Sequence, residues 1–372
     1  MKSILFLIPC LGGGGAERVL VNLANNLDKT KYEVTVQTIF DIGVNKEYLS
    51  NEVKYIAGFK KRFKGNSQIF KLFTPSYLYK KIVKKRYDVV VAYLEGVACR
   101  IVSGCPYKDS KLIAWIHVEQ NNKKTASYSF RSIKEMNDCY NKFSQIACVA
   151  QTVKNDFEAL VDLKKPSIVI YNTNETDLIK EKAKEDLRDF KFSNQINVIS
   201  VGRLVDEKGY DRLLNVHARL LKEGLSHHLY ILGTGGLEEQ LKNQSKNLGV
   251  EQTAHFLGFN KNPYKFVANA DLFVCSSRRE GFSTAVTESL VVGTPVVSTN
   301  CSGANELLGN NNEYGIVVGQ SEEELYQAVK KMLADTDLLK EYKEKAKERG
   351  KNFSKQKTVK AVEEVFDNLF VE

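Results

Sequence analysis

The chain has 372 residues, of which 43% are hydrophobic and 27% charged, and its formal net charge is +9 at pH 7. The length exceeds the size at which one hydrophobic core usually keeps growing, and the composition excludes a disordered or fibrous protein, so we expect two globular domains. The seven cysteines form no C-x-x-C pair and no stretch approaches the roughly 20 apolar residues of a spanning helix, which argues against disulfides, a metal site and a transmembrane protein and predicts a cytoplasmic one.

Short apolar runs alternate with longer helical patterns, which is typical of parallel sheets built from βαβ units and predicts an α/β fold. The first half predicts strands at residues 4–8, 34–39, 89–93, 112–117, 146–150 and 167–171. The second half predicts strands at 197–201, 228–232, 255–257, 272–275, 295–298 and 316–318. A polar stretch over residues 172–194 separates these sets, so we place the domains at residues 1–175 and 176–354. Residues 359–370 have helical spacing with one apolar face.

The first predicted strand runs into four glycines, Gly12 to Gly15, and then into an apolar helical pattern. Glycines let the backbone approach a ligand closely, and the amides at a helix start attract an anion, so this loop predicts phosphate binding. A simple tight turn is the alternative. The loop is not the dinucleotide fingerprint G-x-G-x-x-G, because Glu17 occupies the last position, and this argues against a dinucleotide-dependent oxidoreductase.

The most basic part of the chain lies between Phe59 and Tyr87, where ten Lys and Arg residues meet no acidic one and aromatic residues are interleaved. We predict that this segment binds anionic lipid of the inner leaflet through Lys60, Lys61, Arg62, Lys64, Lys80, Lys81, Lys84 and Lys85. The last four of these are at helical spacings, whereas residues 59–67 predict a loop. The alternative is a solvated basic face above core aromatics. A non-catalytic basic module that binds nucleic acid would explain none of the second half.

A histidine, His117, ends the apolar run of residues 112–116. It therefore lies at the carboxyl end of a predicted strand, where open α/β sheets bind ligands. A structural histidine is the alternative interpretation.

In the second half, Arg203 and Lys208 follow a predicted strand within one loop. A guanidinium grips phosphate oxygens bidentately and an ammonium neutralises them as a point charge, so this pair suits a diphosphate. The alternative is that the two cations are solvated or pair with a neighbouring acid such as Asp206.

The segment from Ser276 to Glu288 follows the predicted strand at residues 272–275. It contains Glu280 and Glu288, which are separated by seven residues. Gly281, Phe282, Ser283 and Thr284 lead from a loop into a helix, so free amides would point at a ligand. Helical rise would place the two glutamates up to roughly 12 Å apart, about the span from a sugar to a ribose across a diphosphate. Since carboxylates repel phosphate, we expect them to accept hydrogen bonds from hydroxyl groups at the two ends. Two solvated acids on a helix are the alternative.

Together these residues resemble the family 4 retaining glycosyltransferases of GT-B fold, over nearly the whole chain. Glu280, Gly281, Phe282 and Glu288 are similar to that family's two-glutamate motif, and Gly202, Arg203 and Lys208 to its diphosphate loop. Gly14, Gly15, Ala16 and Glu17 are similar to its N-terminal glycine loop, and His117 falls where the family often has a histidine near the donor sugar.

The resemblance implies two Rossmann-like, doubly wound domains facing across a cleft, with acceptor binding in the first, donor binding in the second, and a C-terminal helix at about 355–372 on the first. It implies catalysis by Glu280 and His117 without metal or cofactor, using a nucleotide-diphosphate sugar as donor substrate. Departures at Ser283, Thr284 and Ala285 leave the sugar open, with UDP favoured. The opening Gly-Gly-Ala-Glu-Arg loop is similar to bacterial enzymes that extend capsule, O-antigen or exopolysaccharide on lipid carriers. A UDP-sugar epimerase of GT-B-like fold is the alternative enzyme.

Overall fold

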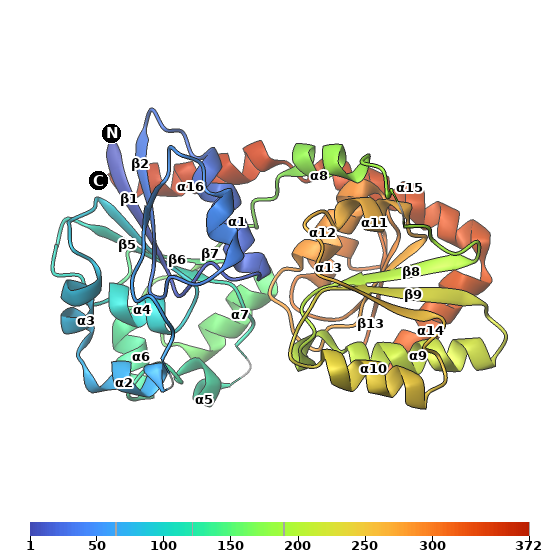
Figure 1. Cartoon of the computed structure of the whole chain (residues 1–372). Coiled ribbons are helices and arrows are strands. Elements are labelled where there is room, and N and C mark those ends of the chain that lie inside the picture. Colours follow the sequence, from blue (N-terminus) through green and yellow to red (C-terminus); the bar gives the residue numbers. More distant parts are fainter. Residues whose placement is uncertain (64, 121, 189, 372) are drawn as a thin grey trace. The chain divides into compact units, whose positions relative to one another are not determined.

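The computed structural model describes residues 1–63, 65–120, 122–188 and 190–371. The chain divides into two compact units, the first comprising Met1–Thr173 and Lys355–Glu372 and the second Asn174–Ser354. Each unit contains one parallel sheet with helices packed around it (Figure 1). The predicted α/β class with two Rossmann-like parallel sheets is confirmed.

The first sheet has the strand order β3-β2-β1-β4-β5-β6-β7. Its strands are β1 (Lys2–Ile8), β2 (Tyr32–Thr38), β3 (Lys54–Ile56), β4 (Val89–Tyr93), β5 (Lys111–Ile116), β6 (Gln145–Cys148) and β7 (Ile168–Val169). Every residue of β4 is buried, as expected for a parallel strand covered on both faces. The order reverses between β1 and β4, so the loops after these two strands lie side by side at the carboxyl edge.

Helices of the first unit cover this sheet. They are α1 (Gly15–Asn26), α2 (Asn66–Leu72), α3 (Pro75–Ile82), α4 (Val97–Val102), α5 (Lys123–Ala126), α6 (Ile133–Tyr140), α7 (Gln151–Leu160) and α16 (Lys355–Asn368), with a short 3-10 turn η1 (Val44–Tyr48). The chain returns to the first unit through α16. Phe366 of α16 is fully buried against Phe6 and Tyr32, and the Tyr32 hydroxyl donates to Asp367 Oδ1 at 2.9 Å.

The second sheet has the order β10-β9-β8-β11-β12-β13. Its strands are β8 (Ile196–Val201), β9 (His227–Leu232), β10 (Ala254–Gly258), β11 (Leu272–Cys275), β12 (Val296–Thr299) and β13 (Ile316–Val318). Around it lie α8 (Thr176–Ala183), η2 (Asp206–Lys208), α9 (Tyr210–Lys222), α10 (Glu238–Asn247), α11 (Tyr264–Asn269), α12 (Thr284–Val292), α13 (Ala304–Leu308), α14 (Glu322–Ala334) and α15 (Thr336–Asn352). Its order reverses between β8 and β11, as in the first sheet.

Two details of the first unit differ from the sequence predictions. Strand β3 has no predicted counterpart, because its three residues form no buried apolar run. The prediction of a helix through Lys80, Lys81, Lys84 and Lys85 is wrong at its C-terminal end. Helix α3 ends at Ile82, because Val83 is extended and buried where the chain leads into β4. No helix in the described ranges combines the length and the apolarity needed to cross a membrane.

Candidate active site

The candidate site of the second unit lies where its sheet reverses strand order. Strands β8 and β11 are hydrogen-bonded neighbours, and both point their carboxyl ends to the same edge. The predicted diphosphate loop follows β8 and the Glu280 segment follows β11. The fold therefore brings together two segments that are about 70 residues apart, at the position where open α/β sheets bind ligands.

Backbone contacts hold the diphosphate loop against the Glu280 segment. Ser276 Oγ donates to the Lys208 carbonyl at 2.9 Å, and the Arg278 amide donates to the Glu207 carbonyl at 2.7 Å. Gly209 lies between them with a φ of +63°, and a Cβ there would approach the Ser276 carbonyl to 2.2 Å. Only glycine fits where these two segments of the chain cross so closely.

Two arginines that sequence reasoning missed lock the same crossing. Arg212 is buried, and its Nε and a terminal nitrogen donate to the Ser276 carbonyl at 2.8 and 2.5 Å, while another donates to the Gln320 carbonyl at 2.6 Å. Arg278 makes a bidentate pair with Asp211 at 2.7 and 2.6 Å. In the sequence, Arg212 lies within a run of apolar helical positions. This pattern indicates that Arg212 is buried but does not identify the groups that it contacts.

Glu280 and Lys208 form the centre of the site. Glu280 Oε1 accepts from Lys208 Nζ at 2.5 Å and from Ser277 Oγ at 2.7 Å. Both side chains are largely buried, at 14% and 22% exposure. Burial lowers the pKa of Lys208, but the Glu280 carboxylate more than offsets this, so its pKa is raised and its ammonium stays charged. Within the described part of the chain, Oε2 of Glu280 makes no hydrogen bond and remains available to a ligand.

Arg203 completes the cationic side of the loop. Its side chain is exposed, and it makes no hydrogen bond or ion pair with the residues that the structure describes. Its positive charge disfavours the charged form of Lys208 and so lowers the pKa of Lys208 slightly, which shows that the two cations of this loop interact electrostatically. Of the alternatives, Asp206 pairs with Arg278 and with neither cation, whereas Arg203 is solvent-exposed and Lys208 pairs with Glu280.

The second glutamate of the motif is carried by α12. Ser283 caps this helix by accepting the Val286 amide at 3.4 Å, and Thr284 is its first residue. Gly281 and Phe282 are buried in the turn before it, where the Phe282 ring packs against Gly303. Glu288 is partly exposed in the second turn. The helix thus begins beside Glu280, with its first amides directed toward the same edge of the sheet.

In the first unit, the glycine loop follows β1 as predicted. Helix α1 begins at Gly15 with Gly14 as its N-cap. A Cβ at Gly14 would lie 2.2 Å from Glu17 Oε2, so a side chain here would displace that carboxylate, whereas Gly13 has open space around it. The loop is therefore shaped by its own glutamate on one side and open on the other.

His117 follows β5 at the same carboxyl edge. Its amide donates to Glu95 Oε2 at 2.9 Å, and its ring centroid lies 4.4 Å from that of Tyr93. Burial lowers the pKa of His117 to about 3, so the ring is neutral near pH 7. Its Nε2 is buried without a hydrogen-bond partner among the described residues. Glu95 was not predicted from the sequence. It follows Leu94, whose φ of +97° is strained for a leucine and is visible only in the structure.

The predicted basic surface is partly as expected. Lys60, Lys61 and Arg62 are exposed in a loop, and Lys80 and Lys81 are exposed in the last turn of α3. Lys84 and Lys85 are exposed beyond that helix, and Lys64 lies outside the described residues. The aromatic residues divide: Phe63 and Phe70 pack together with Phe40 and Phe59, whereas Phe73 and Tyr77 stack on each other and are exposed.

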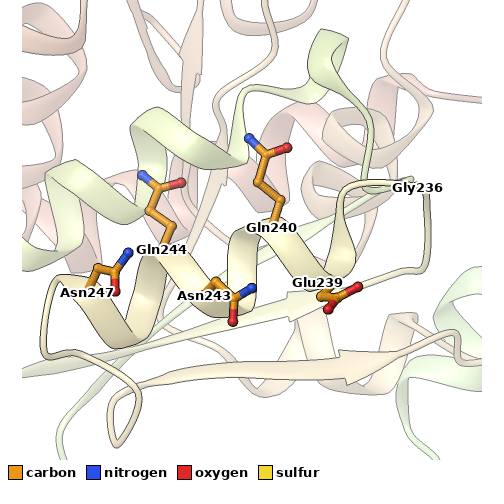
Figure 2. Close-up of a pocket in the computed structure, with 6 residues that line it drawn as sticks. All are labelled: Gly236, Glu239, Gln240, Asn243, Gln244 and Asn247. Atoms are coloured by element: carbon orange, nitrogen blue, oxygen red, sulfur yellow. The ribbon is translucent and has the colours of Figure 1, made fainter.

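A separate polar groove of about 680 Å³ runs along α10 (Figure 2). It is lined by Gly236, Glu239, Gln240, Asn243, Gln244 and Asn247. Gln244 already donates to the Asp211 carbonyl and to Asn215 Oδ1, both at 2.9 Å. None of the predicted site residues lines this groove, so we assign it no role in the reaction.

Comparison with known proteins covers both units. The family model described as Glycosyltransferase Family 4 matches residues 13–178, and the model described as Glycosyl transferases group 1 matches residues 182–349. A Campylobacter jejuni protein named N-acetylgalactosamine-N,N'-diacetylbacillosaminyl-diphospho-undecaprenol 4-alpha-N-acetylgalactosaminyltransferase is 31% identical, over 96% of this chain and 97% of its own length. A second Campylobacter jejuni enzyme, an alpha-1,4-N-acetyl-D-galactosaminyltransferase named for a diNAcBac-PP-undecaprenol substrate, is 27% identical over 98% and 99%.

Solved structures show the same fold. The crystal structure of Anabaena HepE in complex with UDP and glucose matches with a TM-score of 0.81 at 20% identity, covering 99% of this chain and all of that one. The crystal structure of TarM matches with a TM-score of 0.75 at 14% identity, covering all of this chain and 99% of that one.

Proposed function

Because the chain belongs to glycosyltransferase family 4, and is a glycosyltransferase of GT-B fold, we propose that it is a retaining enzyme that moves a sugar from a UDP-sugar to a lipid-linked glycan acceptor in cell-surface polysaccharide synthesis. The observation that carries the proposal is the contact of Lys208 with Glu280 at the point where the second sheet reverses order. It places a cation for a diphosphate and a carboxylate for a sugar hydroxyl side by side.

The two charges divide the donor between them. An ammonium has three N–H donors, and Lys208 uses one of them on Glu280, which leaves two for phosphate oxygens. Arg203 supplies a second cation from the same loop. As the bond to the sugar breaks, negative charge grows on the leaving diphosphate, and fixed cations at that place lower the barrier. The free Oε2 of Glu280 accepts a hydroxyl of the transferred sugar, while Lys208 screens the carboxylate from the phosphates.

The remaining predicted residues have supporting roles in this proposal. Gly281 to Thr284 direct the first amides of α12 toward phosphate, and Glu288 accepts a ribose hydroxyl. His117 acts as a neutral hydrogen-bonding group toward a sugar, since its lowered pKa makes it a poor proton donor near pH 7. Gly14 and Gly15 give close access at the glycine loop. In this proposal no metal or cofactor takes part, and retention follows a front-face departure.

The donor and acceptor are proposed from the relatives. HepE from Anabaena was crystallised with UDP and glucose, and the Campylobacter jejuni enzymes are named for N-acetylgalactosamine transfer to diphospho-undecaprenol carriers. A lipid carrier keeps the acceptor at a membrane. We therefore propose that the enzyme works at the inner face of the plasma membrane, attached peripherally through the exposed cations of residues 60–85.

The experiment is a transfer assay with a panel of nucleotide sugars and a polyprenyl-diphosphate glycan. We expect one UDP-sugar to be consumed, and we expect Glu280→Gln to lower turnover by at least about tenfold while UDP still binds, because the amide loses the charged acceptor. Full activity of both Glu280→Gln and Glu288→Gln would overturn the proposed site. A UDP-sugar that is converted to its epimer without transfer would favour the alternative enzyme.

A further inference from the structure

The corner between α2 and α3 in the first unit (Figure 1) carries the largest group of exposed apolar side chains in the basic segment. Leu72 ends α2 with 75% of its surface exposed. Ile69, Phe73 and Tyr77 are exposed around it. Single exposed apolar residues are common, but four within nine positions of one turn form a patch.

Two arginines, buried Arg100 and exposed Arg131, hydrogen-bond the backbone of this corner. Fully buried Arg100 donates to the carbonyls of Phe70 and Phe73 at 2.9 and 2.8 Å. Arg131 donates to the carbonyls of Lys71 and Leu72 at 2.5 and 3.0 Å. Four successive carbonyls at the end of a helix, which ordinarily rely on water, are thus satisfied by side chains.

Glu135 ties both arginines to the same place. Its carboxylate pairs with the Arg100 guanidinium at 2.9 and 3.1 Å and accepts the Arg131 amide at 2.6 Å. The start of α3 is capped, because Pro75 has no N–H and Thr74 Oγ1 accepts a hydrogen bond from the Tyr77 amide at 3.2 Å. The corner therefore presents exposed apolar side chains while the carbonyls of residues 70–73 are hydrogen-bonded by side chains.

The paired carbonyls lower the free-energy cost of moving this corner from water into lipid. A backbone carbonyl that enters an apolar medium without a partner costs several kcal/mol, which ordinarily prevents a loop from entering a bilayer. Here those four carbonyls already have donors, so the apolar side chains can enter the lipid interface without leaving the carbonyls unpaired. A loop used only for electrostatic attraction would not require this.

Cations surround the corner. Lys71 lies over the Tyr128 ring at 5.2 Å, and Lys81 lies 5.5 Å from the Tyr77 ring. Residues 59–87 contain no acid, and Glu135 is already paired with Arg100. A second basic segment, with Lys123 and Lys124 exposed on α5, leads to Tyr128, so the structure adds cations that the sequence pattern had not grouped with the first.

We propose that the α2–α3 corner inserts into the interface of an anionic bilayer, with Leu72 and Phe73 among the acyl chains and the surrounding lysines at the headgroups. The inference rests on the membrane attachment proposed above and deepens it by naming the inserted residues and the device that lets them insert. A bilayer is favoured over a protein partner because apolar tip and like-charged rim match the two layers of an anionic membrane.

The test uses a new tryptophan. The single native tryptophan, Trp115, is buried, so Leu72→Trp adds one exposed reporter. With vesicles of phosphatidylglycerol and phosphatidylcholine, its emission should shift to the blue and be quenched by brominated acyl chains. Phe259→Trp, at an exposed position of the second unit, is the control and should show neither change. Absence of quenching at position 72 while the protein still sediments with anionic vesicles would overturn insertion and leave only electrostatic attachment.

A matched pair of charge variants tests the carbonyl device. Arg131→Met and Lys134→Met each remove one positive charge close together in the chain, but only Arg131 bonds the corner carbonyls. Lys134→Met should weaken vesicle binding by no more than about fivefold, the value of one cation near an anionic surface. Arg131→Met should weaken it at least about tenfold more, and equal losses would refute the device.

Donor hydrolysis without vesicles reports the proposed transferase activity separately and should be the same in these variants and the wild type. If the wild type transfers no sugar to the polyprenyl-diphosphate glycan, the transferase proposal fails while the insertion test stands. Concentration-dependent dimerisation without lipid that Leu72→Asp abolishes, together with no vesicle binding, would identify the corner as an interface between two copies and overturn the proposal.

Discussion

Replacing Ser277 with alanine tests how Glu280 is held. The Ser277 hydroxyl donates to Glu280 Oε1 at 2.7 Å, and Lys208 donates to the same oxygen. Ser277 is buried, so solvent does not readily supply a replacement for its hydrogen bond to Glu280. A hydrogen bond to a charged group is worth about 1.5 to 3 kcal/mol, and because Lys208 remains we expect the lower end, a loss of about tenfold in kcat.

The assay separates positioning from binding. Turnover of the preferred UDP-sugar should fall about tenfold in Ser277→Ala, while the Kd for UDP changes less than about twofold, because the hydroxyl acts on Glu280 and not on phosphate. Ser245→Ala is the control: that serine is also buried in the second unit, and its hydroxyl donates to the Lys242 carbonyl at 2.8 Å. Unchanged kcat in Ser277→Ala, or an equal loss in both variants, would show that the Ser277 hydroxyl does not position Glu280.

Three further predictions address the loop, the buried ion pair and a buried histidine. Arg203→Ala should weaken UDP binding at least about tenfold in calorimetry with folding intact, through loss of a charge-assisted contact, and unchanged affinity would reject the diphosphate assignment. Arg100→Met should lower the free energy of unfolding by about 3 to 5 kcal/mol in urea, because Glu135 and two carbonyls lose their donor, whereas exposed Arg86→Met should cost less than about 1 kcal/mol. Burial lowers the pKa of His217 to about 3, so the unfolded chain binds more protons and stability should fall as pH drops below about 6.5; His217→Gln should flatten that dependence, and an unchanged slope would contradict it.

Most of the sheet framework could be predicted from the sequence, because parallel strands buried on both faces read as apolar runs. The run of residues 89–93 gave β4 with its observed bounds, and every residue in it is buried. Strand β3 could not be found this way, since it is a three-residue edge strand with an exposed lysine at its start. The end of α3 also escaped prediction, because burial of Val83 outweighs the helical spacing of the lysines.

The candidate site could be predicted only in part from the sequence. The loops of Lys208 and Glu280 were identified separately, and the strand order explains why they meet. Arg212 acts through the Ser276 carbonyl, which lies in a segment distant in the chain, and Ser277 acts through a neutral hydroxyl on Glu280, three residues further along. Such partners leave no charge pattern in the sequence. Arg212 in particular reads as an ordinary helical charge until its burial is known.

The central claim is retaining transfer from a UDP-sugar, and proton NMR of the first-formed product tests it most directly. The enzyme is incubated with the preferred α-linked UDP-sugar and acceptor in the presence of a chelator, and the anomeric coupling of the new linkage is recorded before any equilibration. We predict an α-linked product at an undiminished rate. A β-linked product, or activity that is lost with the chelator and restored by magnesium, would contradict the proposed mechanism.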